Sequence, residues 1–168
     1  MLCIMNHQMA VATKASRVCR ATNRPVSEFG SRRAHGPWAA TYGAKAAIIA
    51  GCSATSNILT GVMYDYGSTG TMAHSYVTSF GCSVEGEHKA FDTYIKTHKG
   101  EPLILLIDTY DTLKCGVLNA IRAFRENGID DSYEPGYGIR LDSGDLAYLS
   151  IECREILNEN GLKGCKIF

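Results

Sequence analysis

The chain has 168 residues, of which 45% are hydrophobic, and this length and composition indicate one folded domain with a sizeable core rather than a disordered segment. Seventeen basic residues balance seventeen acidic ones, so no overall field favours binding to nucleic acid or to an anionic membrane. The seven cysteines lie far apart, without a CxxC pair or a histidine at ligand spacing, which argues against zinc and against a redox motif.

The first residues of the chain do not resemble an export signal. They lack a basic region followed by an apolar core, and no stretch approaches the ~20 apolar residues of a membrane span. The odd number of cysteines and their helical settings favour reduced thiols. We therefore expect a cytoplasmic protein. A mitochondrial leader is the alternative, because several basic residues precede the first acidic residue, Glu28: Lys14, Arg17, Arg20 and Arg24.

Helices dominate the elements expected in the first half of the chain. Pro37 stands at the start of an alanine-rich stretch and Gly51 at its end, as is typical of helix boundaries. Apolar spacing and turn residues predict the other elements. The expected elements are a helix over about 7–22, a short strand from about 26, a helix over 37–51, a shorter helix over 55–67, and a strand from about 69 that leads into the segment 73–81.

The second half of the chain has clearer patterns. A continuous apolar run ends in Asp108, as expected of a parallel strand that is buried on both faces. The helix after it has apolar residues on one side and stops at Gly128. The expected elements are a polar helix over 85–100, a strand over 102–108, a helix over 111–127, a strand over 137–143, a helix over 144–161 and a final strand from about 165.

Strands and helices thus alternate along the chain. The expected strands begin near 26, 69, 103, 137 and 165, and a helix follows each of the first four. Such alternation indicates right-handed βα units and a parallel sheet, which places the protein in the α/β class. The spacing suits a (β/α) barrel, but a complete barrel needs ~250 residues, so the chain would hold about half of one. A five-stranded open sheet of the flavodoxin type fits the length better, and periodicity alone leaves both open.

Polar residues gather where the expected strands end. "EFGSRR" follows the first strand, "GTMAHS" the second, "DTYDT" the third and "RLDSGD" the fourth. At the carboxyl ends of parallel strands, loops converge and helix N-termini attract anions. One such cluster is often only a helix cap, and Asp142 and Ser143 taken alone fit that interpretation. The coincidence of four clusters predicts a functional site.

The stretch "LILLIDTYDT" fits neither of two acidic motifs that begin in a similar way. A haloacid-dehalogenase-type phosphatase needs two aspartates two residues apart, whereas Asp108 and Asp111 are three apart. The phosphoribosyl pyrophosphate (PRPP) loop of the Rossmann-like phosphoribosyltransferases needs adjacent acids and then a Thr-Gly-rich loop, and this stretch has the wrong order. We reject both interpretations.

Five motifs are specific as a set, in this order and at this spacing: "EFGSRRAHG", "TSN", "GTMAHSYVTSF", "DTYDTLKCGV" and "RLDSGDL". Through them the chain closely resembles nicotinate phosphoribosyltransferase, from about residue 6 to the last residue. The resemblance implies an α/β fold: a partial (β/α) barrel of the type II phosphoribosyltransferase kind, with about four βα units plus a final strand. Residues 1–168 would form the central part of this barrel domain, incomplete at both ends.

The same resemblance implies a function. Members of this family join nicotinate to PRPP, which gives nicotinate mononucleotide and pyrophosphate for NAD biosynthesis. They couple this reaction to ATP hydrolysis through a phosphohistidine. The implied cofactors are ATP, as a co-substrate, and Mg²⁺, with metal ligands left unassigned. The implied partners are nicotinate, PRPP, ATP and, for a full-length chain, a second copy in a homodimer; nucleic acid and membranes are not among them.

Residues for the ribose and the phosphates follow from the resemblance. PRPP loses pyrophosphate through a cation-like state, so the site must hold a ribose, a polyanion and a flat base together. Carboxylates suit the ribose hydroxyls or a bridging Mg²⁺ ion, and arginines suit phosphates. By resemblance, Asp142, Ser143 and Gly144 would contact the ribose side of PRPP, and Arg32 or Arg33 would contact its phosphates.

Residues for the base are implied in the same way. Phe29 occupies the position where the family stacks an aromatic ring on the pyridine, although it could also be a plain core residue. Arg140 would contact the other side of the base or its carboxylate, and Thr71 would form a hydrogen bond near it. Ser56 stands where the nicotinamide-using relative has an aspartate, which would repel a carboxylate in a poorly solvated site. Serine there favours nicotinate.

His74 matches the histidine that the family phosphorylates from ATP. A neutral imidazole is a competent nucleophile when its other nitrogen is held by a carboxylate, and Asp108 is the candidate for that role. Phosphorylation would add about −2 charges beside the pyrophosphate site, which can drive product release. The remaining histidines are expected to be surface or packing residues: His7, His35, His88 and His98.

The chain departs from the family in length. Family members run to several hundred residues, with an N-terminal aromatic substrate contact and a glycine-rich phosphate loop that are not visible here. We expect the isolated polypeptide to have little or no activity and to fold poorly, because half a barrel leaves strand edges open. The alternatives are a nicotinamide-specific or quinolinate-type relative, the first of which Ser56 argues against, and a non-catalytic remnant that associates with and regulates a full-length subunit.

Overall fold

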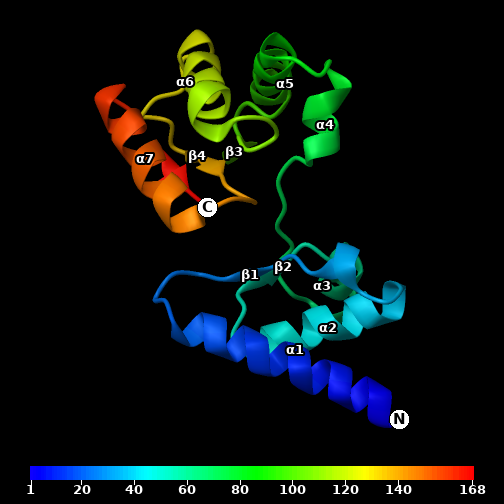
Figure 1. Cartoon of the computed structure of the whole chain (residues 1–168). Coiled ribbons are helices and arrows are strands. Elements are labelled where there is room, and N and C mark those ends of the chain that lie inside the picture. Colours follow the sequence, from blue (N-terminus) through cyan, green and yellow to red (C-terminus); the bar gives the residue numbers. More distant parts are fainter. The chain divides into compact units, whose positions relative to one another are not determined.

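The computed structural model describes all residues from Met1 to Phe168. They form two compact units, Met1–Gly70 and Thr71–Phe168. Figure 1 colours the first unit from blue to blue-green and the second from green to red. None of the helices combines the length and the hydropathy that a membrane span requires. All seven cysteines are free thiols.

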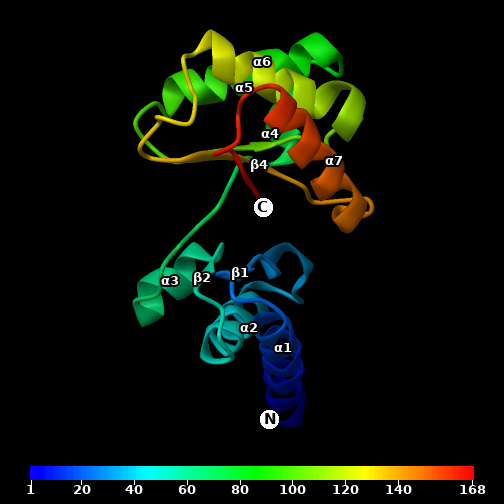
Figure 2. The same ribbon diagram turned by 90° about the vertical axis from the view of Figure 1, so that its left-hand side faces the viewer.

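The first unit consists mainly of helices. Its elements are α1 (Leu2–Arg20), β1 (Ser27–Glu28), the 3₁₀ turn η1 (Ser31–Arg33), α2 (Pro37–Ile49), β2 (Ala54–Thr55) and α3 (Ile58–Tyr64). The two strands pair in parallel, with Ser27 opposite Ala54 and Glu28 opposite Thr55, and an isolated bridge joins Thr55 to Ser68. Both strands lie on the same side of α1 and α2 (Figure 2). This short ladder places the loops after β1 and β2 next to each other.

Local sequence explains where α2 and α3 begin and end. Pro37 occupies the first turn of α2, where its missing N–H breaks no helical hydrogen bond. Gly51, with a φ of 119°, turns the chain after α2. α3 begins after Asn57, whose side-chain oxygen accepts a hydrogen bond from Thr60 N at 2.9 Å. These signals limit both helices to short, defined spans.

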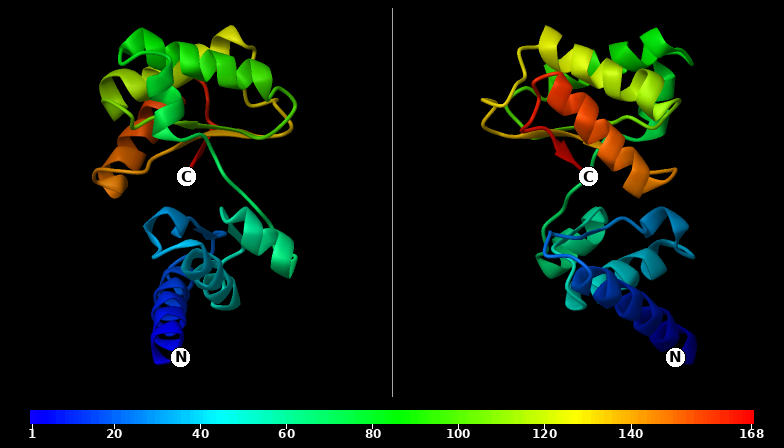
Figure 3. Two further views of the ribbon diagram at one scale, coloured as in Figure 1. Left: turned by 90° about the vertical axis from the view of Figure 1, so that its right-hand side faces the viewer. Right: turned by 60° about the vertical axis from the view of Figure 1, so that its left-hand side comes forward.

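A three-stranded parallel sheet in the order β3-β4-β5 organises the second unit. The elements are α4 (His74–Ser79), α5 (Val84–Thr97), β3 (Leu103–Leu106), the π-helix η2 (Thr112–Gly116), α6 (Val117–Glu126), β4 (Tyr137–Arg140), α7 (Leu146–Glu159) and β5 (Lys166–Ile167). Leu103 pairs with Tyr137 and Leu106 with Arg140, so β3 and β4 end together. In Figure 3, α5 and α6 run side by side over the sheet.

The hydrophobic core of the second unit lies between the sheet and these helices. Both faces of β3 are covered, which explains why its sequence is continuously apolar instead of alternating. The expectation of a buried strand over 102–108 is therefore confirmed, although the ladder itself ends at Leu106. Fully buried core side chains include Leu103, Leu105, Ile107 and Ile139 from the sheet region and Phe91, Ile95, Phe124 and Leu157 from the helices.

The strand expected near residue 69 is not formed. Only Ser68 makes an isolated bridge, and the residues from there to α4 are irregular. The partner of β1 is instead β2, Ala54–Thr55, at the start of a segment that was expected to be helical. A strand of two residues is too short to show a periodic pattern, so the sequence carries no signal for it.

Two helices also differ from expectation. α1 begins at Leu2, before the expected start near residue 7. The helix expected over 111–127 opens as the π-helix η2 before α6 begins at Val117. The fold is thus mixed α/β with short parallel sheets. Because the strands form two separate sheets, a continuous partial barrel of four βα units is not confirmed.

Candidate active site

Asp108 lies just beyond the end of β3 and connects the loops that follow β3 and β4. Its Oδ2 accepts hydrogen bonds from the backbone N of Asp142 at 2.9 Å and from Ser143 Oγ at 2.6 Å. The side chain is only 1% exposed, and the buried Oδ1 has no hydrogen-bond partner. One carboxylate oxygen therefore fixes the loop after β4, while the other is left facing the histidine described next.

His74 is the first residue of α4, and its ring lies between polar groups on both sides. Nε2 is 3.8 Å from Asp108 Oδ1 and 3.6 Å from Asp142 Oδ2. Nδ1 is 3.2 Å from Thr109 Oγ1. Two carboxylates on the Nε2 side favour a proton on that nitrogen, so we assign the Nε2–H tautomer with the Thr109 hydroxyl donating to Nδ1. In this tautomer Nδ1 carries the lone pair.

Arg140, at the end of β4, joins residues from two distant parts of the sequence. Nη1 donates to Thr71 Oγ1 at 2.7 Å, and Nη2 donates to Asp142 Oδ1 at 2.6 Å. The arginine side chain is 18% exposed and that of Asp142 is 25% exposed, so this pair is only partly screened by water. The structure thus brings together Thr71, Arg140 and Asp142, which the sequence predicted for the base and the ribose.

The turn after β4 is not a simple helix cap. α7 is capped by Asp145, which accepts a hydrogen bond from Tyr148 N at 3.1 Å. Asp142 and Ser143 instead interact with Arg140 and Asp108, which disfavours their interpretation as caps. Gly144 has a φ of 80°, a conformation that L side chains rarely adopt.

The other predicted residues lie in the first unit. Phe29 follows β1 and is 37% exposed. Arg32 and Arg33 lie in η1, and Ser56 follows β2 with its backbone N donating to Glu28 O at 2.9 Å. The "EFGSRR" and "TSN" motifs are therefore neighbours, as the carboxyl ends of paired parallel strands should be.

The predicted site residues form two groups, one in each unit. Thr71, His74, Asp108, Arg140, Asp142, Ser143 and Gly144 belong to the second unit, and Phe29, Arg32, Arg33 and Ser56 to the first. Sequence reasoning missed Thr109, which faces the His74 ring, and Glu28, whose carboxylate bonds to both loops of the first unit. Both residues lie inside the motifs already singled out, but nothing in the sequence marked them.

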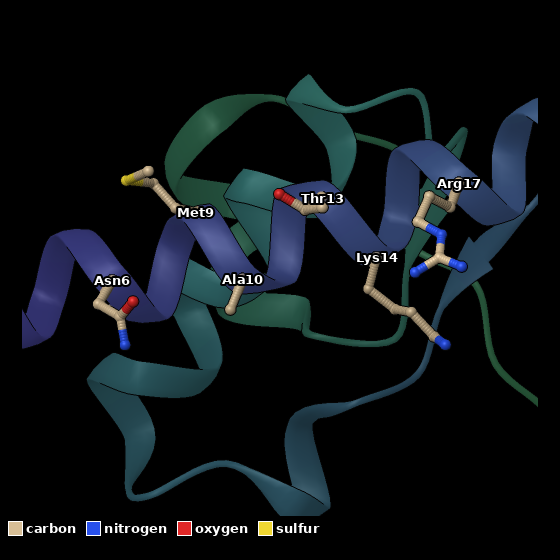
Figure 4. Close-up of a pocket in the computed structure, with 6 residues that line it drawn as sticks. All are labelled: Asn6, Met9, Ala10, Thr13, Lys14 and Arg17. Atoms are coloured by element: carbon tan, nitrogen blue, oxygen red, sulfur yellow. The ribbon is translucent and has the colours of Figure 1, made fainter.

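Other polar features lie outside this site. A hollow along α1, shown in Figure 4, is lined by none of the predicted residues. No group of three or more His, Cys, Asp or Glu side chains is placed to hold a metal ion. His88 Nε2 lies 2.9 Å from Glu126 Oε2 but without hydrogen-bond geometry, and His98 Nδ1 lies 3.0 Å from Glu101 Oε2. These two histidines have pairing partners of their own.

Comparison with known sequences identifies the family. No protein-family model matches the chain. The nicotinate phosphoribosyltransferase of Bacillus subtilis is 45% identical to it over 168 residues, which cover 99% of this chain and 32% of that protein. The chain belongs to the nicotinate phosphoribosyltransferase family. The resemblance inferred from the motifs is therefore confirmed, for a chain that spans 32% of the length of this relative.

Solved structures agree with this relationship. The crystal structure of human nicotinic acid phosphoribosyltransferase matches with a TM-score of 0.78 and 25% identity, over 96% of this chain and 42% of that one. The nicotinate-nucleotide pyrophosphorylase of Pyrococcus furiosus matches with a TM-score of 0.75 and 31% identity, over 96% of this chain and 40% of that one. The mixed α/β fold is thus that of nicotinate phosphoribosyltransferases. The roles of single residues stay predictions.

Proposed function

We propose that this chain carries part of the active centre of a nicotinate phosphoribosyltransferase, which forms nicotinate mononucleotide and pyrophosphate from nicotinate and PRPP. The observation that carries the proposal is the 45% identity to the Bacillus subtilis enzyme along the whole chain. In this proposal the complete protein has a (β/α) barrel of the type II phosphoribosyltransferase kind. It acts as a cytoplasmic homodimer.

The groups at the end of β4 suit the ribose of PRPP. Positive charge develops on the ribose as pyrophosphate leaves, and a nearby carboxylate stabilises it. Asp142 can supply that carboxylate, because it is partly exposed while Arg140 and the Asp108 contact to its backbone hold it in place. Ser143 and Gly144 form the turn against which the ribose would lie. Arg32 or Arg33 would contact the phosphates.

A Mg²⁺ ion bound together with PRPP would neutralise part of the pyrophosphate charge. Mg²⁺ is usually held by one or two carboxylates together with substrate phosphates. Asp142 fits such a ligand, since its side chain is 25% exposed, whereas the buried Oδ1 of Asp108 faces the His74 ring. The residues present therefore fit an ion shared with the substrate rather than a cage built from protein groups alone.

Recognition of the base would depend on one aromatic ring and three polar groups. Phe29 offers a ring for stacking on the pyridine, and Arg140 with Thr71 offers a cation and a hydroxyl. Ser56 adds no negative charge, so a carboxylate on the ring is tolerated. We therefore propose nicotinate, rather than nicotinamide, as the base.

His74 is the proposed phosphoacceptor from ATP. The Thr109 hydroxyl would first turn away from Nδ1. The Nδ1 lone pair would then attack the γ-phosphorus, an N–P bond would form, and the bond to the ADP oxygen would break. The proton on Nε2 would stay in place, held towards Asp108 and Asp142. The phosphoryl group would bring about −2 charges next to these carboxylates. The resulting repulsion gives a reason for the site to rearrange and to release pyrophosphate.

A chimera tests the phosphoacceptor. Residues 1–168 would replace the matching stretch of the Bacillus subtilis enzyme, which supplies the remaining length. His74→Ala should abolish acid-labile phosphate incorporation from γ-labelled ATP and should uncouple ATP from synthesis, while slow PRPP-dependent synthesis persists. His98→Ala is the matched control, since that ring pairs with Glu101 near the end of α5. Phosphate incorporation that survives His74→Ala would show that the assignment is wrong.

The isolated chain tests the dependence on the rest of the protein. We expect the purified 168-residue polypeptide to make little or no nicotinate mononucleotide when it is given nicotinate, PRPP, ATP and Mg²⁺. Appreciable PRPP-dependent synthesis by this polypeptide would contradict the expectation. An inactive chimera with the wild-type residues would instead favour the non-catalytic alternative.

A further inference from the structure

Glu28, the last residue of β1, forms bonds to both loops of the first unit. Its Oε1 accepts a hydrogen bond from the backbone N of Gly30, in the loop that carries Phe29. Its Oε2 accepts one from Thr55 Oγ1 at 2.6 Å, at the end of β2. The backbone O of the same residue accepts from Ser56 N at 2.9 Å. One residue therefore connects the two segments on either side of this strand pair.

The connection continues beyond the carboxylate. Thr55 is fully buried, and its hydroxyl oxygen also accepts a hydrogen bond from Asn57 N at 3.0 Å. The Asn57 side chain then donates to Ser31 Oγ at 3.1 Å, which returns the network to the first loop. The result is a chain of hydrogen bonds that runs from Glu28 through Thr55 and Asn57 to Ser31.

These hydrogen bonds supplement a short strand pair. β1 and β2 contribute only two residues each, so their ladder cannot hold the two loops in register alone. The space for the carboxylate is also specific. A Cβ on Gly30 would lie 2.9 Å from Glu28 Oε1, so any side chain there would displace an oxygen that already accepts a hydrogen bond. Hydrogen bonds to a charged acceptor are about twice as strong as neutral ones.

We propose that Glu28 is a positioning residue for the base: it sets the relative placement of Phe29 and Ser56 by clamping both loops. The proposal rests on the proposed function for the identity of the base, nicotinate. Glu28 itself does not contact the pyridine in this scheme. Its carboxylate is engaged by Gly30 and Thr55, so both of its oxygens are directed towards these donors.

Amide exchange on the chimera with the Bacillus subtilis enzyme tests the clamp without any ligand. Thr55→Val keeps the side-chain shape but removes the hydroxyl, and Thr55→Ser keeps the hydroxyl. We expect Thr55→Val and Glu28→Gln to speed hydrogen exchange of the Gly30, Ser56 and Asn57 amides by about tenfold, as loss of a charge-assisted bond predicts. Thr55→Ser should stay within about twofold of wild type. The matched control is Glu155→Gln, on the exposed side of α7.

Nicotinate added to the ¹⁵N-labelled chimera tests the role in binding. In wild type we expect nicotinate to shift the amide resonances of Gly30 and Ser56. In Thr55→Val we expect a dissociation constant for nicotinate about tenfold higher, and in Thr55→Ser one close to the wild-type value. Gly30→Ala, which crowds the carboxylate, should weaken binding in the same direction. If Thr55→Val does not fold, the nicotinate affinities of Glu28→Gln and Gly30→Ala test the positioning role instead.

The outcomes separate the two hypotheses. Unchanged exchange in both Glu28→Gln and Thr55→Val overturns the clamp. Faster exchange with unchanged nicotinate affinity overturns the positioning role and leaves a purely structural contact. If the wild-type chimera shows no nicotinate-induced shifts at all, the proposed base is wrong, whatever the exchange data show about the clamp.

Discussion

Glu87, on α5, is a fully buried carboxylic acid, and the burial of this single polar side chain costs free energy of folding. Its Oε2 accepts a hydrogen bond from Asn119 Nδ2 at 2.9 Å, and its Oε1 is buried without a partner. Burial raises the pKa of Glu87 above its usual range, although hydrogen bonds from Asn119 and Cys115 partly oppose this rise. The folded state therefore holds the proton of this group more tightly than the unfolded chain does.

The raised pKa predicts a pH-dependent stability. The pKa of Glu87 is higher in the folded state than in the unfolded chain. Its contribution to the free energy of unfolding is therefore fully present below the unfolded pKa of about 4.3 and is lost as the pH rises through the folded pKa. In the unfolded chain the carboxyl group ionises at a lower pH, so ionisation favours unfolding over this range. Glu87→Gln should therefore gain free energy of unfolding relative to wild type as the pH is raised from about 4.5 to about 8.

Urea unfolding of both proteins at several pH values measures this difference. Glu155→Gln, at an exposed position, is the control and should track wild type at every pH. A difference between Glu87→Gln and wild type that does not change with pH would contradict the prediction.

Single site residues were partly predictable from the sequence. Strand ends pointed to Asp108 and Asp142, and the structure places both carboxylates within 4 Å of one ring nitrogen of His74, at 3.8 and 3.6 Å. The contact between Arg140 and Thr71 joins residues 69 positions apart, and no local pattern encodes such a pair. Which oxygen of Asp108 accepts from Ser143 depends equally on the tertiary fold.

The π-helix η2, at the scale of one element, follows directly after the loop that carries Asp108 and Thr109. Asp111 caps it by accepting hydrogen bonds from Leu113 N at 3.2 Å and Lys114 N at 2.9 Å. Its last residue, Gly116, packs against the backbone after β3: a Cβ there would lie 1.9 Å from Ile107 O. This close approach sets how the loop leaves the sheet.

Gly116→Ala is therefore expected to destabilise the second unit by about 3 kcal/mol, because backbone atoms cannot give way as a flexible side chain can. Gly70→Ala serves as the control, since a Cβ at Gly70 would meet nothing within 4 Å. Urea or thermal unfolding followed by circular dichroism gives the difference. Equal stability of the two variants would mean that η2 can move away from Ile107 at little cost.

Elements with a long, uniform pattern were predictable, and short or irregular ones were not. The apolar run of β3 and the helices α5 and α7 follow from residue type and spacing. No periodic signal marks the two-residue strand β2 or the π-helix η2, because each is shorter than the window in which a period can be recognised.

Burial is unevenly distributed over the whole molecule. All residues of the main hydrophobic cluster, from Met72 to Cys165, belong to the second unit. The buried hydrophobic residues of the first unit are small: Ala44, Ala46, Ala47 and Cys52. Alternation of strands and helices predicted the α/β class, but it gave no indication that the strands would divide between two sheets with unequal cores.

This imbalance predicts that the two units differ in independent stability. Each Å² of apolar surface that is buried on folding stabilises a protein by about 25 cal/mol. Alanine and cysteine side chains bury little apolar area, whereas Phe91 and Phe124 each bury far more. We expect residues 71–168 to fold as an isolated polypeptide with a cooperative urea transition. Residues 1–70 should not, because large side chains such as Ile49 and Val62 are 71% and 78% exposed.

Circular dichroism and urea unfolding of the two halves, with the full chain as reference, measure this. The transition of 71–168 should coincide with the main transition of the full chain, since the same core is lost in both. In that case only the first unit would fold poorly in the isolated chain. A cooperative transition for 1–70 would show instead that the small core of the first unit is sufficient for its stability. The absence of a transition for 71–168 would show that the second unit depends on contacts that its own core does not supply.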